Sequence, residues 1–211
     1  ALGYNSLYAN TTGTQNVSVG AYALDASSTA SYNTAVGYRA LGASTTAQEN
    51  AAFGTDALLA ATTGGRNTAL GAYTLSASTD GTENTAVGYQ ALTATTSGHS
   101  NAAVGEAALD ANTTGTGNVA VGRDALGANT TASNNTAVGL NALQVNTTGS
   151  ENTAVGRGAG INVTTGGNNF FVGYNTGTSS SPGGSITTGN NEGVLGNSDV
   201  SKINVQVSLT V

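Results

Sequence analysis

The sequence predicts an all-β fold, a parallel β-solenoid (β-roll) built from 17-residue coils. Three positional observations favour it. Glycine recurs at an unbroken interval of 17 residues, an apolar residue stands directly before each of these glycines, and from Gly20 onward an asparagine stands four residues before each. A fixed interval without insertions is typical of repeat proteins, in which each repeat is one structural unit. The glycines of the series are Gly3, Gly20, Gly37, Gly54, Gly71, Gly88, Gly105, Gly122, Gly139, Gly156 and Gly173.

One unit, residues 84–100, reads NTAVGYQALTATTSGHS. A helix would contain Gly, Asn and paired Thr throughout, all unfavourable inside it, and 17 residues do not close whole turns at about 3.6 residues per turn. Two short strands and two turns fit better, because Gly permits a bend after Asn-Thr-Ala-Val and Thr-Thr-Gly suits a return turn. Alternate residues of a strand face opposite sides, so we expect Thr85 and Val87 to face the core and Ala86 to face outward.

Stacked coils place equivalent residues above one another at about 4.8 Å, the spacing of hydrogen-bonded strands. An insertion would shift every column out of register, which accounts for the constant interval. The asparagines are expected to form a hydrogen-bonded amide ladder, as in stacked cross-β structures. The residues predicted to form these structural ladders in two central coils are Asn84, Val87, Gly88, Leu92, Asn101, Val104, Gly105 and Leu109.

The alanine of each strand predicts a homotrimer. With one Val and one Leu as its only large apolar side chains, a coil gains little burial against the entropy of ordering 17 residues. The alanine position stays small and apolar, from Ala35 through Ala86 to Ala154, although it is expected to face outward. A second copy packed on that face in a symmetric assembly would explain this, whereas the alternative is a monomer in which both strand faces are internal.

The composition excludes several classes of function. Among 211 residues there are 5 Lys and Arg against 11 Asp and Glu, which argues against a nucleic-acid partner. No apolar run approaches the roughly 20 residues of a membrane span, so no membrane insertion is expected in this segment. A hydrophobic content of 38% with a net charge of only −6 favours an ordered repeat protein over a disordered chain.

The repeat divides the chain into three predicted segments. Residues 1–176 form the solenoid, the Gly- and Ser-rich residues 177–190 a loop or linker, and residues 191–211 a C-terminal segment. From Ile203 the alternation predicts a strand that pairs with other subunits. Phe170 and Phe171 replace the usual Thr and Ala, and are expected to seal the open end of the core as an atypical terminal coil.

The titratable residues predict no enzyme. His99 is the single histidine and there is no cysteine, so nucleophilic triads and His/Cys metal sites lack their components. The carboxylates are scattered, and no acidic calcium-binding repeat is present; no cofactor or metal is expected. The variable positions are the two that follow each repeat glycine. Tyr and Arg, which are favoured in interfaces, occupy these positions at Tyr4, Tyr22, Tyr38, Arg39, Tyr73, Tyr89, Arg123, Arg157 and Tyr174. The candidate surface contacts taken from this set are Tyr38, Arg39, Tyr73, Tyr89 and Arg123.

The motif Val87-Gly88-Tyr89-Gln90-Ala91-Leu92 resembles the left-handed parallel β-roll of trimeric autotransporter adhesin heads, although the repeat there is shorter. The longer string NTAVGYQALTATTSGHSNAAVG, residues 84–105, resembles the repeats of phage tail fibre-like proteins, and VLGNSDVSKINVQVSLTV, residues 194–211, is similar to the segment that precedes their self-cleaving chaperone. These resemblances imply a homotrimer.

The predicted function is a non-enzymatic structural rod of a phage tail fibre or similar appendage, extracellular or on the virion surface, that supports attachment to a host. Its expected partners are other copies of the chain, in a trimer or an end-to-end filament, and a host-surface glycan or protein. A bacterial trimeric adhesin is the alternative, which a C-terminal membrane anchor in the full-length gene would indicate. An ice-binding β-solenoid is a further alternative, because paired Thr columns such as Thr62-Thr63 and Thr130-Thr131 could order water.

Overall fold

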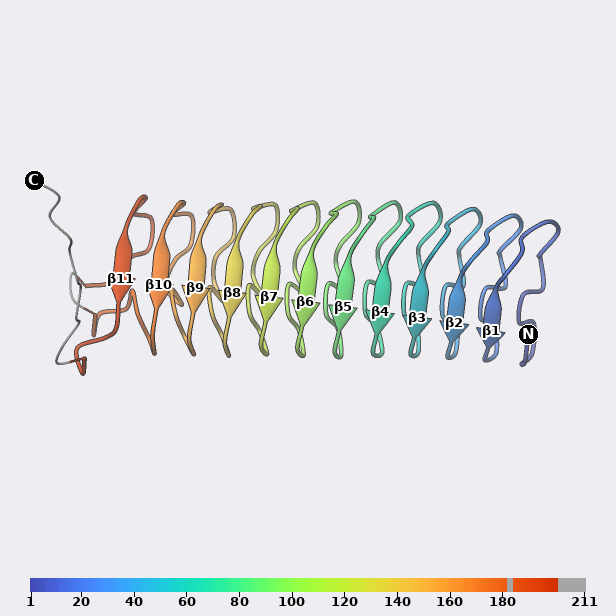
Figure 1. Cartoon of the computed structure of the whole chain (residues 1–211), viewed down its shortest axis with the longest axis horizontal. Coiled ribbons are helices and arrows are strands. Elements are labelled where there is room, and N and C mark those ends of the chain that lie inside the picture. The colour runs from blue at the N-terminus through green and yellow to red at the C-terminus, as the bar shows by residue number, and fades with distance from the viewer. Residues whose placement is uncertain (182–183, 201–211) are drawn as a thin grey trace, which may run out of the picture.

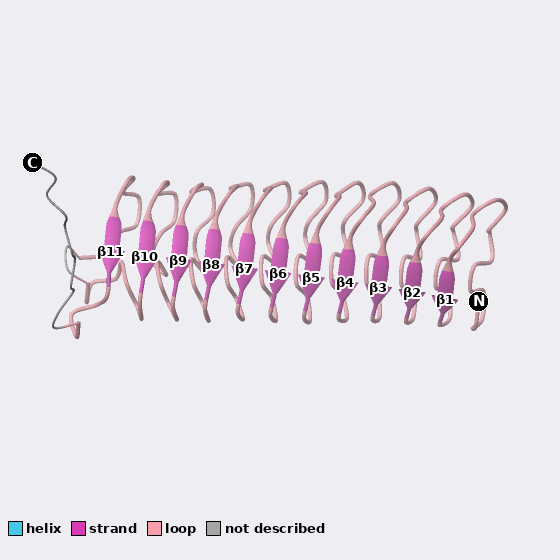
Figure 2. Cartoon of the chain, in the orientation of Figure 1, coloured by secondary structure: helices cyan, strands magenta, loops and turns pink. Residues whose placement is uncertain are grey.

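A computed structural model describes residues 1–181 and 184–200. Eleven strands of three residues each form one parallel sheet in which every strand pairs with the next strand along the chain. They stand in a single row that runs in chain order from β1 to β11 (Figure 1). Turns make up the rest of each coil, and no part of the described chain is helical (Figure 2). The predicted parallel β-solenoid of 17-residue coils is confirmed. The strands are β1 (Val17–Val19), β2 (Thr34–Val36), β3 (Ala51–Phe53), β4 (Thr68–Leu70), β5 (Thr85–Val87), β6 (Ala102–Val104), β7 (Val119–Val121), β8 (Thr136–Val138), β9 (Thr153–Val155), β10 (Phe170–Val172) and β11 (Gly193–Leu195).

The solenoid continues beyond the predicted boundary at residue 176. Strand β11 pairs with β10 with Val194 opposite Phe171, an offset of 23 residues instead of 17. Residues 177–190 therefore belong partly to a longer coil rather than to a separate linker: Thr164 donates its backbone N–H to the Thr187 carbonyl at 2.8 Å, as Thr147 does to Thr164. The strand predicted from Ile203 lies outside the described residues.

Each coil contains one strand, so the expectation of two strands per coil is wrong. The second and fourth residues after the repeat glycine take left-handed backbone conformations, as Gln90 (φ 59°) and Leu92 (φ 54°) do. A segment in which every second residue has a left-handed backbone conformation cannot extend as a strand. The segment after the glycine therefore turns twice and brings the leucine inward.

The predicted facing of the strand is also wrong. Ala86 and Ala103 are fully buried inside the coil, whereas the side chain of Val104 is 40% exposed and Val87 is partly exposed. The strand alternates as expected, but its alanine and not its larger valine points into the core. Ala91 and Leu92 are consecutive and both fully buried. Leucine fills most of the narrow core, so the strand that faces it across the core carries alanine.

The asparagines four residues before each glycine form the predicted kind of ladder inside the coil. Asn84 Oδ1 accepts the backbone N–H of Asn101 at 3.0 Å and its side-chain Nδ2 at 3.1 Å. The same Nδ2 of Asn101 also donates to the carbonyl of Gly115 at 2.9 Å. Buried amides need such partners, because an unpaired polar group costs about 1–3 kcal/mol. The column thus ties each coil to the next and closes each coil across its own turn.

A second polar column lies in the core seven residues after each glycine, and some of its hydroxyl groups have no partner. Ser44 Oγ is fully buried without a hydrogen bond, whereas Thr95 Oγ1 donates to the Asn112 carbonyl at 3.0 Å. The next residue of the column after Ser44 is Ala61, also fully buried. The position therefore accepts a methyl group in place of the hydroxymethyl group.

We expect Ser44→Ala to raise the free energy of unfolding by about 1 kcal/mol, because it removes a buried hydroxyl that lacks a partner. Thr95→Ala, in the same column, should lower it, since it removes a satisfied hydrogen bond and a buried methyl group. Guanidinium denaturation and amide hydrogen exchange of the two variants provide the measurement. A loss of stability in Ser44→Ala equal to that in Thr95→Ala would show that Ser44 is bonded after all.

Candidate functional site

The first two residues after each repeat glycine project from the end of the strand, and they carry most of the exposed tyrosines. Tyr38 and Tyr89 occupy the first position and are 47% and 48% exposed. Tyr22 and Tyr73 occupy the second position, where φ is near +60°. The left-handed turn thus directs both side chains away from the core.

Tyrosines from neighbouring coils meet in pairs. The rings of Tyr22 and Tyr38 lie edge to face with centroids 6.1 Å apart, and those of Tyr73 and Tyr89 do the same at 5.9 Å. Each pair joins the second position of one coil to the first position of the next. The predicted contacts Tyr73 and Tyr89 are therefore brought together, and Tyr38 pairs with a residue that was not chosen as a candidate.

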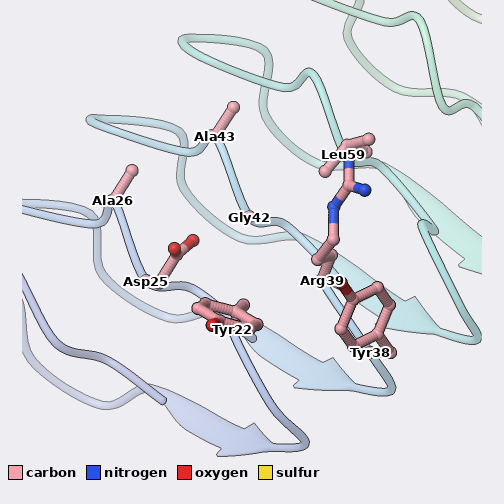
Figure 3. A pocket seen from close by; sticks show the side chains of 8 residues that line it. All are labelled: Tyr22, Asp25, Ala26, Tyr38, Arg39, Gly42, Ala43 and Leu59. Atoms are coloured by element: carbon pink, nitrogen blue, oxygen red, sulfur yellow. The ribbon is translucent and has the colours of Figure 1, made fainter. Parts of the chain in front are cut away.

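A pocket of about 450 Å³ lies beside the Tyr22–Tyr38 pair (Figure 3). Gly42 forms its base in the column five residues after the repeat glycine, between Asp25 of the preceding coil and Leu59 of the following one. A Cβ atom on Gly42 would lie 3.2 Å from a methyl group of Leu59 and 3.5 Å from Asp25 Oδ1. The missing side chain opens the space, which we call the Gly42 notch. Its other lining residues are Tyr22, Ala26, Tyr38, Arg39 and Ala43.

The Gly42 notch has one basic and one acidic side chain. Arg39 Nε lies 3.4 Å from Asp56 Oδ1, and the guanidinium carbon lies 5.8 Å from the centroid of the Tyr38 ring. Figure 3 places the guanidinium toward Leu59 and the Asp25 carboxylate on the opposite side, near Tyr22. Tyrosine rings and aliphatic groups thus line the space between a hydrogen-bond donor and a hydrogen-bond acceptor.

A second glycine in the same column, Gly127, leaves a pocket of similar volume, about 450 Å³. Its lining is different: it contains Asp110, Asp124, Gln144 and Val145 and no aromatic residue. Burial raises the pKa of the Asp110 carboxyl above its usual value, and the negative charge of Asp124 acts in the same direction. The remaining predicted contact, Arg123, does not line this pocket, but its Nε lies 3.7 Å from a carboxylate oxygen of Asp124, which does.

His99 is an exposed turn residue, as its position in the repeat predicts. Its Nδ1 lies 3.4 Å from Ser100 Oγ, and Ser100 donates to a carboxylate oxygen of Glu83 at 3.3 Å. In a nucleophilic triad the carboxylate orients the histidine, whereas here it binds the serine. Within residues 1–181 and 184–200, no three His, Cys, Asp or Glu side chains gather in a group that could hold a metal ion. The same residues contain no helix long and apolar enough to span a membrane.

The paired threonine columns use their hydroxyl groups internally. Thr62 Oγ1 donates to the Thr79 carbonyl and Thr130 Oγ1 to the Thr147 carbonyl, both at 3.2 Å. The second threonine of each pair, such as Thr63 and Thr131, is exposed in the turn. One of the two columns considered for ice binding is therefore a ladder that joins the coils.

Sequence reasoning identified Tyr38 and Arg39 but missed Asp25, Gly42 and Leu59, which complete the pocket. A signal was present in the column five residues after the repeat glycine, where most coils carry a polar or large side chain. Only Gly42 and Gly127 interrupt the run Tyr8, Asp25, Leu59, Ser76, Thr93, Asp110, Gln144 and Ile161.

No protein family, curated protein or solved structure matches the chain. The class it belongs to is defined by the fold alone: it is a parallel β-solenoid of tandem 17-residue coils.

Proposed function

We propose that the chain is a non-enzymatic structural rod, a shaft segment of a phage tail fibre or similar extracellular appendage on a virion or cell surface. It supports attachment to a host, and it works as a homotrimer joined through the outward face of its single sheet. The observation that carries the proposal is an exposed apolar column that runs along the whole sheet without a charge.

The outward positions of the sheet are the first and third residues of each strand. The third positions of β3, β4, β6 and β9 carry Phe53, Leu70, Val104 and Val155, which are 39–49% exposed. The first positions are Thr, Ala, Val, Phe or Gly, so none of the outward residues of β1–β11 is charged. Charged side chains stand instead in the turns on either side of the sheet, as Glu83 and Glu106 do beside β5 and β6.

The dimensions of this face suit self-association. Eleven strands at about 4.8 Å and three residues at about 3.3 Å give a face of roughly 50 Å by 10 Å. That is about 500 Å², as large as the exposed apolar patches that are often functional on monomeric proteins. A second copy has the same length and the same 17-residue spacing, so it can follow the column over every coil. The alanine column does not form this face, because its side chains are buried within the chain itself.

We expect light scattering in native buffer to give about 61 kDa, three times the chain mass of 20.5 kDa. Val104→Glu combined with Val121→Glu places two charges on adjacent strands of the face, and should dissociate the trimer, because unpaired charges are costly to bury. The matched control is Ser97→Glu with Thr114→Glu, two exposed turn residues in one column of adjacent coils. It should leave the mass unchanged.

A mass of 20.5 kDa for the unmodified chain across a range of concentrations would contradict the proposal. So would an equal loss of mass in both variants, since it would show an effect of added charge and not of the face. The autotransporter alternative predicts the same trimer. Sequencing the complete gene separates the two: a membrane anchor would favour the adhesin, and a self-cleaving chaperone would favour the tail fibre.

A further inference from the structure

We propose that the Gly42 notch binds the ring of a neutral sugar. The inference deepens the proposed function and rests on it for its biological setting, because a sugar site on the shaft would add contacts to a host-surface glycan. Its evidence is separate: it depends on the notch lined by Tyr22, Asp25, Tyr38, Arg39, Gly42 and Leu59.

The apolar walls suit the C–H face of a pyranose. The edge-to-face arrangement of Tyr22 and Tyr38 holds two rings at a fixed angle of 88°, and Tyr38 is 47% exposed. Leu59 and two alanines complete the apolar lining. The volume of about 450 Å³ lies within the range of about 300–1,000 Å³ that is usual for small-molecule sites, which are mostly apolar with a few polar groups.

The charges favour a neutral ligand. Two tyrosines beside an aspartate could hold an organic cation through the ring faces. Here, however, the Arg39 guanidinium, which is paired with Asp56 at 3.4 Å, already lies over the Tyr38 ring at 5.8 Å and takes the place of a ligand cation on that face. The Asp25 carboxylate likewise disfavours an anion. A sugar hydroxyl both donates and accepts, so it can bind a carboxylate on one side and a guanidinium on the other.

The backbone does not require glycine at residue 42. It lacks the left-handed φ of the repeat glycines such as Gly37, and the same column holds Ser76 and Thr93 in later coils. At Thr93 the hydroxyl is accommodated within the turn, where it donates to the Gln90 carbonyl at 2.7 Å. Glycine at residue 42 thus keeps clear of Leu59 and the Arg39 carbonyl, each 3.2 Å from an added Cβ, and it leaves the notch open toward solvent.

The Gly127 notch is a comparison site built into the chain. It has the same glycine in the same column and a similar volume, but Ala107, Arg123 and Asp124 stand where the Gly42 notch has Tyr22, Tyr38 and Arg39. It therefore has no aromatic wall, and its carboxylates, Asp110 and Asp124, have no tyrosine beside them. A sugar that needs a ring face to stack on should not bind there.

The test is saturation-transfer difference NMR of the intact chain with the methyl glycosides of glucose, galactose and N-acetylglucosamine. Choline and acetate serve as cation and anion probes. We expect the ring C–H protons of at least one glycoside to receive saturation. Gly42→Thr, which fills the notch with a residue the column already carries, and Tyr38→Leu, which removes a ring face, should each weaken binding at least tenfold. Gly127→Thr is the matched control and should bind as the unmodified chain does.

Circular dichroism and hydrogen exchange should show that the variants keep the fold. Absence of signal from all three glycosides would overturn the inference, as would equal binding by Gly42→Thr, equal loss in Gly127→Thr, or binding of choline or acetate in place of a sugar. The readout does not depend on the oligomer. Sugar binding by a chain of monomeric mass would contradict the proposed trimeric rod alone, and a trimer that binds no glycoside would contradict the sugar site alone.

Discussion

Gly105→Ala should lower the free energy of unfolding by about 3 kcal/mol or more. Gly105 has φ 137°, a conformation that is essentially restricted to glycine and costs other residues of order 1–3 kcal/mol. A Cβ atom there would lie 2.6 Å from the backbone carbonyl carbon and oxygen of Gly122 in the next coil. Hydrogen bonds join the two coils on both sides of this contact. The Gly122 N–H donates to the Val104 carbonyl at 2.8 Å, and the Leu109 N–H donates to the Ala125 carbonyl at 3.0 Å. Neither coil can move away without breaking these bonds.

The destabilisation by Gly105→Ala should spread from coil to coil, because each coil contacts only its neighbours and the cooperativity of the solenoid depends on the contacts between neighbouring coils. Hydrogen exchange should therefore show reduced protection in the coils of β6 and β7 before the rest. The control is Gly184→Ala, at φ 84° with no atom within 4 Å of the added Cβ, which isolates the conformational term from the steric one. Protection in Gly105→Ala equal to that of the unmodified chain would mean that the coils separate easily, against the register described above.

The 17-residue coil could be predicted from the sequence because it depends only on like residues recurring at one spacing. The column of Asn84 and Asn101 shows why: in a stack, the best partner for a buried amide is the same amide one coil away, at 3.1 Å. A periodic pattern reports such contacts directly. No knowledge of the path of the chain within a coil is needed.

The facing of the strand could not be predicted in the same way, because alternation places Ala86 opposite to Thr85 and Val87 but does not say which side is the core. The turn after the strand decides this. Gly88 at φ 128°, Gln90 at φ 59° and Leu92 at φ 54° bring the leucine inward. Left-handed conformations are uncommon for leucine, so the sequence does not indicate this turn. With leucine filling the core, the strand that faces it has room only for alanine.

The Gly42 notch was missed for a different reason. Tyr38 and Arg39 could be selected from the sequence because they are large side chains at a variable position of the repeat. The pocket, in contrast, is formed by the absence of a side chain at residue 42, and by Asp25 and Leu59 from the two adjoining coils. Such a site appears only when the columns of several repeats are compared position by position.

Around Phe171 the large and small residues of the coil change places, and this arrangement predicts the second large effect on stability. Phe171 occupies the alanine position of β10 and is fully buried inside the stack, one coil before β11, rather than sealing its open end as predicted. The leucine position is glycine both in the coil of Phe171 and in the preceding coil, at Gly177 and Gly160. A Cβ atom on Gly160 would lie 2.8 Å from the Phe171 ring, and one on Gly177 would lie 2.6 Å from it. The ring therefore fills the space that leucine side chains fill elsewhere.

We expect Phe171→Ala to lower the free energy of unfolding by about 3–5 kcal/mol, the usual range for removing a buried aromatic ring. Gly160→Leu alone should also destabilise, by about 1–3 kcal/mol or more, because the ring already occupies that volume. The double variant Phe171→Ala with Gly160→Leu restores the alanine of the β10 coil and the leucine of the preceding coil, while Gly177 remains glycine. Gly160 has φ 62°, close to the 50° of Leu143 in the coil before it, so the backbone accepts the leucine. The double variant should therefore recover part of the loss.

The measurement is hydrogen exchange at the amides of the coils of β9 and β10, since a terminal coil of a solenoid can open without the rest. A coupling free energy of about 2 kcal/mol or more between the two substitutions would show that they share one volume. Tyr8→Ala, at a turn position that is 78% exposed and outside the sheet face, removes an aromatic ring from the surface and should have a much smaller effect. Additive effects of Phe171→Ala and Gly160→Leu would contradict this account, because they would mean that the ring and the missing leucine do not compete for the same space.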